Sequence, residues 1–192
     1  MILCIIPARS GSKRLPGKNL RPFCGKPLLQ WSVEQALRIN EIDRVVLTTD
    51  YSYADLGYEH DKHGIWAMTS IIERPSYLCR DDAPMAHVLC HTLSDFLTWP
   101  SLVVLLQPTS PTRTDETVRK AISMALPLNP WDTRGGAASS ADGCGPDGAV
   151  YAFTPNRLPP LNDCIYFGND DIDINTLEDF EKAEAVMKAR LK

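Results

Sequence analysis

Strand-length apolar runs, each followed by a segment with helical spacing, constrain the fold of this chain most strongly. Runs of this kind, typical of strands buried on both faces of a sheet, cover residues 2–6, 45–48 and 102–106. Apolar residues recur at helical spacing over residues 27–39, 82–98, 115–126 and 176–191. Because strands and helices alternate, helices should cover both faces of a mainly parallel sheet. We therefore predict an α/β fold with three layers, α/β/α, around a mostly parallel central sheet.

The rest of the chain is expected to complete one domain over residues 1–192. Residues 149–153 and 165–167 are expected to form strands, and a weak strand is expected near residues 66–68. Residues 7–26 are punctuated by Gly and Pro, and residues 127–148 are rich in Pro, Gly, Ala and Ser, so both segments are predicted to be loops. Ligands of such sheets bind beyond the carboxyl ends of the strands.

Composition excludes several classes of protein. Hydrophobic residues make up 44% of the chain and charged residues 23%, which rules out wholesale disorder. The net charge of −4 argues against a general binder of nucleic acids or anionic membranes. The longest aliphatic run is too short to span a bilayer, and no basic stretch precedes the first apolar run. The six cysteines include no Cys-x-x-Cys pair, so we expect reduced structural thiols and a cytoplasmic location.

Charge is segregated along the chain. The first 33 residues contain no acid but hold six of the twenty Lys and Arg residues, whereas residues 163–184 hold eight acids. The basic residues share their segment with several Gly and Pro residues. This pattern favours a basic loop suited to phosphates and a separate acidic cluster suited to a cation, with two solvated surface faces as the alternative.

The segment ARSGSKRLPGKN, residues 8–19, carries the strongest chemical signal. Its glycines allow backbone N–H groups to turn toward an anion, and its cations can neutralise charge during phosphoryl transfer. The spacing from Gly11 to Gly17 is one residue too long for a Walker A loop, and Asn19 stands where that loop has Ser or Thr. The G-x-G-x-x-G fingerprint is also absent, which argues against a dinucleotide-binding loop.

Six ordered motifs resemble the acylneuraminate cytidylyltransferase family. The loop matches its A-R-x-x-S-K-x-x-P-x-K-N, and Thr48-Thr49-Asp50 resembles the end of its second strand. Further matches are R-P-x-x-L-x-x-D-x-A from Arg74, L-L-Q-P-T-S-P-x-R from Leu105, G-A-V-Y from Gly148, and D-I-N-T-x-x-D from Asp173. The resemblance implies a Rossmann-like nucleotidyltransferase fold. It also implies transfer of CMP from CTP to the anomeric hydroxyl of an acidic nonulosonic sugar, with release of pyrophosphate.

The resemblance also implies roles for individual residues. Arg9, Lys13 and Lys18 would be catalytic, holding the triphosphate while N–H groups of residues 10–12 close around it. The implied nucleotide-binding residues are Ala8, Arg9, Ser10, Gly11, Ser12, Lys13, Lys18, Asn19, Arg74 and Asp81. The implied sugar-binding residues are Gln107, Thr109, Ser110 and Tyr151. Asp171, Asp173 and Asn175 would bind the cofactor Mg²⁺.

Three departures from the family pattern keep alternatives open. Asn175 replaces the second acid of the metal motif, Pro84-Met85 replaces small polar residues, and the segment from Arg113 to Gly148 is short. The shortened part, at about residues 127–148, normally carries sugar contacts and a dimerisation arm, so a homodimer stays an open expectation. The alternatives are a non-catalytic nucleotide-binding relative, an octulosonate-type cytidylyltransferase, and a glycosyltransferase that uses the D-x-D pattern of Asp171 and Asp173.

Overall fold

A seven-stranded sheet forms the centre of the protein. The computed structural model describes residues 1–58, 64–126, 136–140, 148–155, 164–168 and 170–192. The strands are β1 (Ile2–Ala8), β4 (Arg44–Thr49), β5 (Thr69–Glu73), β6 (Leu102–Leu106), β7 (Gly136–Ser140), β8 (Val150–Phe153) and β9 (Cys164–Gly168). Their order is β5-β4-β1-β6-β8-β7-β9. Within this sheet β8 runs antiparallel to both neighbours, whereas the other paired strands are parallel. The predicted mostly parallel sheet is therefore confirmed.

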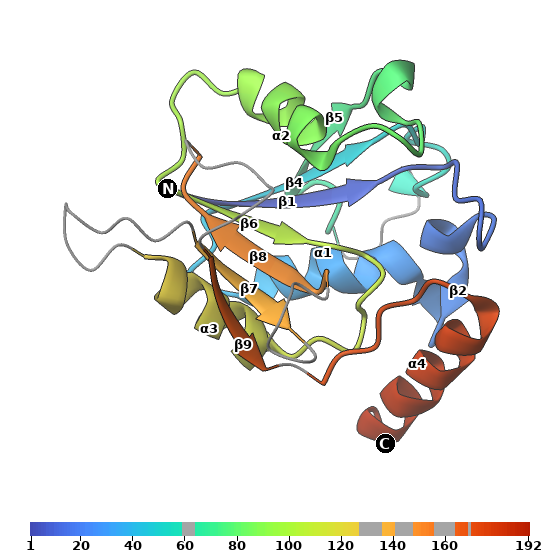
Figure 1. Ribbon diagram of the computed structural model, residues 1–192. Coiled ribbons are helices and arrows are strands. Elements are labelled where there is room, and N and C mark those ends of the chain that lie inside the picture. The colour runs from blue at the N-terminus through green and yellow to red at the C-terminus, as the bar shows by residue number, and fades with distance from the viewer. Residues whose placement is uncertain (59–63, 127–135, 141–147, 156–163, 169) are drawn as a thin grey trace.

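The described residues also form four α-helices. They are α1 (Leu28–Arg38), α2 (Met85–Ser94), α3 (Asp115–Ala125) and α4 (Leu177–Arg190). Short 3-10 helices cover Lys18–Leu20 and Ser76–Leu78, and a small hairpin pairs β2 (Pro22–Phe23) with β3 (Lys26–Pro27). Helices α1 and α3 lie on one side of the sheet and α2 on the other (Figure 1). None of the helices in the described ranges is long and apolar enough to cross a membrane.

Alternation along β1 explains the two hydrophobic clusters that lie on opposite faces of the sheet. Leu3 and Ile5 pack with Leu89 and Leu93 of α2 in one cluster of buried residues. Their neighbours Cys4 and Ile6 belong to the cluster on the opposite face, which α1 and α3 cover. Successive side chains of a strand point to opposite faces, so an uninterrupted apolar run needs a helix layer on each side. The three-layer α/β/α arrangement is confirmed.

The four cysteines whose side chains the structure describes are free thiols: Cys4, Cys24, Cys79 and Cys90. Cys4 lies wholly buried in β1, and burial raises the pKa of its thiol to about 12. A thiol that resists ionisation is a poor nucleophile and metal ligand. These four residues are thus unpaired, as expected of reduced thiols, and a structural role is supported for the buried Cys4.

Two boundaries differ from the expectation. The strand expected near residues 66–68 is wrong, since Trp66 is buried within a turn and the strand β5 begins at Thr69. The helix expected over residues 82–98 is limited to α2. It begins after Pro84, which caps it in an extended conformation, and it ends before the fully exposed Leu97. The strand was expected at Trp66 because that segment is apolar, but pairing with β4 places β5 at residues 69–73 instead.

The segment expected to be a loop over residues 127–148 contains the strand β7. This part of the prediction is wrong because β7 is paired on both sides, with β8 and with β9, despite its composition of small residues. Ser139 adds a side-chain contact, its Oγ accepting a 3.0 Å hydrogen bond from the N–H of Val150. Residues 127–135 and 141–147 lie outside the described residues, and with them most of the shortened segment.

Gly136 at the start of β7 leaves no room for a side chain. Replacing it with alanine is expected to lower the free energy of unfolding by about 3 kcal/mol. The physical reasons are a Cβ that would lie 2.3 Å from the carbonyl oxygen of Ala152, and a φ of +146°. Urea denaturation measures the loss.

Gly168 at the end of β9 provides the control. A Cβ there meets no atom within 4 Å, so Gly168→Ala should change the free energy of unfolding by about 0.5 kcal/mol or less. Equal losses for the two variants would contradict the close packing of Gly136 against β8.

Candidate nucleotide-binding cleft

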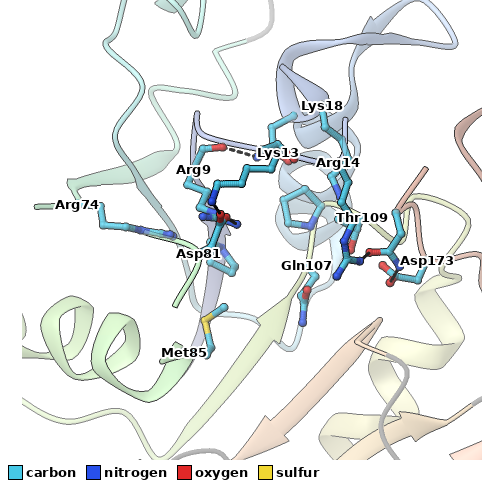
Figure 2. A pocket seen from close by; sticks show the side chains of 15 residues that line it. Arg9, Lys13, Arg14, Lys18, Arg74, Asp81, Met85, Gln107, Thr109 and Asp173 are labelled. Atoms are coloured by element: carbon cyan, nitrogen blue, oxygen red, sulfur yellow. Dashed lines mark hydrogen bonds and ion pairs between the residues drawn. The ribbon is translucent and has the colours of Figure 1, made fainter. Parts of the chain in front are cut away.

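A cleft of about 580 Å³ opens at the carboxyl ends of the parallel strands. Its lining comes from the segments after β1, β5 and β6, from the start of α2, and from the segment before α4 (Figure 2). The lining residues are Pro7, Arg9, Ser12, Lys13, Arg14, Lys18, Asn19, Arg74, Asp81, Met85, Gln107, Pro108, Thr109, Asp173 and Asn175. This edge is where α/β sheets bind ligands. Parts of the chain more than 160 residues apart thus meet in one site.

Arg9 and Lys13 share one carboxylate, that of Asp81. Arg9 Nη2 lies 2.5 Å from Asp81 Oδ1, and Lys13 Nζ lies 2.6 Å from Asp81 Oδ2. Hydrogen bonds from Lys13 and Arg9 lower the pKa of Asp81, and the same contact raises the pKa of Lys13. Arg9 Nη1 also donates to the carbonyl oxygen of Cys79. One wall of the cleft therefore carries two cations and one carboxylate, held together by short ion pairs (Figure 2).

Lys18 stands on the opposite wall and has a neutral partner. Its Nζ donates a 2.6 Å hydrogen bond to the carbonyl oxygen of Ile174. Burial lowers the pKa of Lys18 from its ordinary value, and the charge of Asp173 opposes this change. The ammonium is therefore held in the cleft at a cost in solvation that an anionic ligand would offset.

Arg14 belongs to the same wall. Its Nη1 donates a 2.6 Å hydrogen bond to Asn175 Oδ1, and Asn175 Nδ2 donates in turn to Asp173 Oδ2, also at 2.6 Å. The loop after β1 is thereby joined to the segment before α4. The wall formed by Arg14, Lys18, Asp173 and Asn175 also holds two cations and one carboxylate.

The loop of residues 8–19 is shaped by its own polar contacts. Ala8 is buried in β1, and the buried Asn19 donates from Nδ2 to the carbonyl oxygen of Arg9 at 2.9 Å. Ser10 N–H donates to Asp50 Oδ1 at 2.7 Å, and Ser12 N–H donates to the carbonyl oxygen of Ser10 at 2.9 Å. The N–H groups of Ser10 and Ser12 thus have protein acceptors here, and the closing of residues 10–12 around a ligand stays a prediction. Asp50, which follows the neighbouring strand β4, accepts the hydrogen bond from Ser10 and so holds the turn in place.

Gly11 and Arg74, which the resemblance also implies for the nucleotide, differ in their access to the cleft. Gly11 is exposed and does not line the cleft, and a Cβ there would meet no atom within 4 Å. Arg74 is buried and does line it, with Nη2 donating to the carbonyl oxygen of Thr48 at 2.9 Å. Burial lowers the pKa of Arg74, and its buried Nε has no hydrogen-bond partner in the described part of the chain. That orphaned donor is suited to a ligand acceptor.

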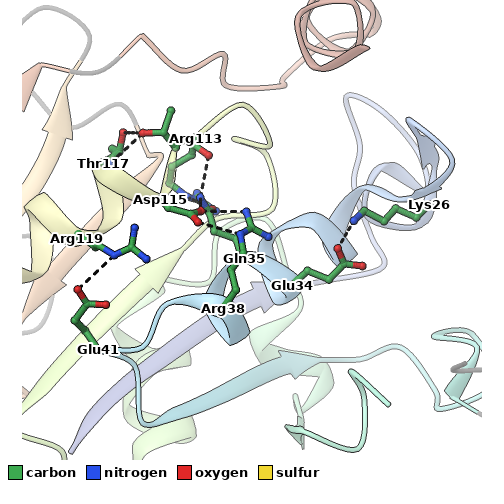
Figure 3. A network of polar contacts seen from close by, with 10 residues as sticks. Lys26, Glu34, Gln35, Arg38, Glu41, Arg113, Asp115, Thr117 and Arg119 are labelled. Atoms are coloured by element: carbon green, nitrogen blue, oxygen red, sulfur yellow. Dashed lines mark hydrogen bonds and ion pairs between the residues drawn. The ribbon is translucent and has the colours of Figure 1, made fainter. Parts of the chain in front are cut away.

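Buried Arg113 fixes the floor of the cleft, at the turn after β6. It donates to the carbonyl oxygens of Gln107 and Ala149, to Gln35 Oε1 at 2.9 Å and to Ser32 Oγ at 3.0 Å. Figure 3 shows this guanidinium beside α1 and the start of α3. A buried guanidinium is tolerable only when its donors are satisfied, so these acceptors cannot move independently. The turn that presents Gln107 to the cleft is therefore rigidly placed.

The four residues implied for the sugar are not equivalent. Gln107 and Thr109 line the cleft, whereas Ser110 is completely buried behind it. Thr109 Oγ1 and Ser110 Oγ are buried and lack hydrogen-bond partners among the described residues. Tyr151 lies on β8 opposite Leu105 and packs against the core on the α2 side, and it is not part of the cleft lining. Its place favours a role in packing.

The three residues implied for a metal are also separated. Asp173 and Asn175 line the cleft, but Asp171 lies at Thr112, with Oδ1 3.5 Å from Thr112 Oγ1. The N–H of Ile172 binds the same hydroxyl and directs the chain there. Across the described ranges, no three His, Cys, Asp or Glu side chains gather into a metal-binding group. The expected pairing of Asp171 with Asp173 at one metal is thus not supported by the geometry.

Sequence reasoning did not select several lining residues. Arg14, Met85, Pro7 and Pro108 are part of the cleft, and Asp50 holds the loop from behind. Arg14 carried a signal, since it is a fourth cation inside a loop already interpreted as phosphate-binding. Met85 carried one too, as a large apolar residue in a position where small polar ones were expected. Asp50 belongs to a motif noted in the sequence, but its contact with Ser10, 40 residues away, could not be predicted from it.

Comparison with known proteins assigns the chain to a family. The family model for cytidylyltransferases matches residues 3–139. The chain belongs to the cytidylyltransferase family. A CMP-N,N'-diacetyllegionaminic acid synthase of Legionella pneumophila is 37% identical over 127 residues, which make up 64% of this chain and 52% of that protein. An N-acylneuraminate cytidylyltransferase of Escherichia coli O18:K1:H7 is 36% identical over 130 residues, or 68% of this chain and 29% of that protein.

These relatives are longer than the chain, which spans about half of the first and less than a third of the second. They confirm the resemblance to acylneuraminate cytidylyltransferases. A solved structure of a CMP:2-keto-3-deoxy-manno-octonic acid synthetase, complexed with CTP, has a TM-score of 0.73 at 17% identity. The match covers 98% of this chain and 99% of that one, and it confirms the nucleotidyltransferase fold.

Asp81 competes with any anion that approaches Arg9 and Lys13. Asp81→Asn is therefore expected to tighten the binding of inorganic tripolyphosphate about fivefold at low salt, since repulsion from a nearby carboxylate exceeds the value of an exposed ion pair. The gain should shrink as salt is added. Isothermal titration calorimetry without metal measures both effects.

The neighbouring Asp82 supplies a control with the same change in net charge. It pairs with Arg80 at 2.8 Å and does not line the main cleft. Asp82→Asn should tighten binding much less than Asp81→Asn, because Asp82 acts on Lys13 only through space and pairs with Arg80 instead. If Asp81→Asn weakened binding instead, Asp81 would act chiefly by positioning the two cations.

Proposed function

We propose that this protein transfers CMP from CTP to the anomeric hydroxyl of an acidic nonulosonic sugar, releasing pyrophosphate. The observation that carries the proposal is the cleft itself, where Arg9, Lys13, Arg14 and Lys18 from one loop converge beyond the end of β1. Four cations in a cleft of about 580 Å³ are suited to a triphosphate. Membership of the cytidylyltransferase family supports CTP as the nucleotide.

In the proposed reaction, the anomeric oxygen attacks the α-phosphorus of CTP in line with the departing pyrophosphate. The new bond joins that oxygen to phosphorus, the bond between the α- and β-phosphates breaks, and the hydroxyl proton leaves to solvent. Little covalent work falls to the protein, since positioning and charge stabilisation dominate phosphoryl transfer. Arg9, Lys13 and Lys18 would orient the triphosphate and stabilise the charge that develops on the leaving group.

Asp173 is the residue proposed to hold Mg²⁺. Magnesium commonly takes one or two protein carboxylates together with substrate phosphates and water, so one carboxylate in a triphosphate cleft fits it. Asp173 lines the cleft, and its Oδ2 accepts a hydrogen bond from Asn175 Nδ2. Asn175 offers no charge, and its Oδ1 already accepts from Arg14. When bound, Mg²⁺ would neutralise part of the triphosphate charge.

The acidic sugar is proposed to lie against Gln107 and Thr109. Both line the cleft on the floor that Arg113 fixes, and neither carries a negative charge that would repel a sugar carboxylate. The names of the curated relatives support a nonulosonic acid. An octulosonate is the competing acceptor, because that sugar appears in the name of the solved structure with a similar fold.

Pyrophosphate release from CTP with Mg²⁺ tests the function directly. A panel of nonulosonic acids and an octulosonate would be offered, with ATP, GTP and UTP as nucleotide controls. We expect release only with CTP and a nonulosonic acid. Release with the octulosonate alone would change the assigned acceptor, and CTP binding without release from any acceptor would support a non-catalytic relative.

The partly buried Lys18 predicts an unusual pH dependence of anion binding. Its pKa is lowered by burial, so affinity for inorganic pyrophosphate should be full below that pKa and decline as pH rises through it, at a lower pH than for an ordinary lysine. Lys13 keeps its proton over this range, because Asp81 raises its pKa. Calorimetry between about pH 7 and pH 10 measures the decline.

Lys18→Arg separates this effect from general alkaline weakening. A guanidinium keeps its charge throughout the range, so the variant should show a flatter decline. The same decline in both proteins would show that Lys18 does not control the alkaline limb.

A further inference from the structure

Arg14 differs from the other basic residues of the cleft in how its charge is held. Arg9 and Lys13 are paired with the carboxylate of Asp81. Arg14 instead donates to the neutral amide oxygen Asn175 Oδ1 at 2.6 Å, and among the described residues it has no ion-pair partner. A neutral acceptor fixes the direction of a guanidinium without cancelling its charge. The full charge of Arg14 is therefore available to an anion in the cleft.

Asn175 is itself held in place by several contacts. Its Nδ2 donates to Asp173 Oδ2, and its backbone N–H donates to Asp179 Oδ2 at 3.1 Å, next to the capping box that starts α4. The preceding Ile174 is completely buried and donates from its N–H to the carbonyl oxygen of Thr109 at 2.8 Å. These contacts anchor the residue on both sides. Asn175 can thus orient an exposed arginine that would otherwise sample many rotamers.

We propose that Asn175 is a positioning residue: it directs Arg14, one of the four cations assigned to the triphosphate, into the cleft with its charge intact. This inference rests on the proposed function for the identity of the anion. Two hydrogen-bond donors at the end of a fixed guanidinium suit phosphate oxygens better than a point charge would. The neutral side chain at position 175 is essential to the arrangement, because a carboxylate there would form an ion pair with Arg14 and reduce its pull on the ligand.

The charges of the two walls show why position 175 matters. The wall of Arg14, Lys18 and Asp173 holds two cations and one carboxylate, as the wall of Arg9, Lys13 and Asp81 does. A second acid at position 175 would leave its wall without net charge. Charges this close interact strongly enough that one added carboxylate changes the affinity for an anion measurably.

Calorimetric titration of inorganic tripolyphosphate, at low salt and with a chelator in place of metal, tests the inference on the whole chain. Arg14→Gln is expected to weaken binding about tenfold, with partial recovery in Arg14→Lys, which restores the charge but not the fork. Asn175→Asp should weaken binding by a similar factor. Asn175→Ala should cost less, and adding it to Arg14→Gln should cost nothing more, because Asn175 acts through Arg14.

Arg119→Gln is the matched control. Arg119 lies on α3, pairs with Glu41 at 3.4 Å and is absent from the cleft, yet its loss changes the net charge equally. The inference is overturned if Arg14→Gln binds no more weakly than Arg119→Gln, or if Asn175→Asp binds as tightly as the wild type. Thermal unfolding of each variant shows whether a loss of affinity reflects unfolding.

CTP in a parallel titration separates this inference from the proposed function. If the wild type bound CTP no better than tripolyphosphate, the assignment of a cytidine nucleotide would fail. The effects of Arg14 and Asn175 on tripolyphosphate would still decide the inference about the phosphate wall. Conversely, strong CTP binding that is indifferent to both residues would overturn the inference and leave the proposed function standing.

Discussion

The buried guanidinium of Arg113 is the constraint on which the site depends. A permanently charged group without water must have its donors satisfied by protein oxygens, and here they come from α1, from the end of β6 and from the residue before β8. Three elements that are distant in sequence are thereby fixed to one planar group. The turn after β6 cannot shift without leaving this charge partly unsatisfied, and that turn carries the floor of the cleft.

On this rigid floor, the cleft divides its positive charge between two walls with different partners. One wall ties Arg9 and Lys13 to Asp81, which orders them and partly offsets their charge. The other wall holds Arg14 and Lys18 through the neutral oxygens of Asn175 and Ile174. The two walls should therefore attract an anion differently. A cation that is paired with a carboxylate attracts the anion less, whereas a hydrogen bond to a neutral oxygen leaves the charge of the cation intact.

Much of this arrangement could be predicted from the sequence, for specific reasons. The basic loop and the strand before it are local features, and the α1 and α3 segments have strong periodicity, so their prediction needed no tertiary information. Asp171 shows where such reasoning stops. Its spacing from Asp173 is that of a metal motif, but the hydroxyl of Thr112, about 60 residues away, draws the chain elsewhere. Strand β7 escaped prediction because its small residues become a strand only between β8 and β9.

The sequence by itself determined the class of the fold and the family, and it predicts that the first loop binds phosphate. All three inferences rest on short contiguous segments, in which the residue types and their order leave few alternatives. Only the tertiary structure decided which charges face one another: that Asp81 joins Arg9 to Lys13, and that Asn175 receives Arg14. Which charges pair depends on their distance in space, because the interaction between two charges weakens as that distance grows. The chain brings these partners together only when the sheet has formed and Arg113 has fixed its edge.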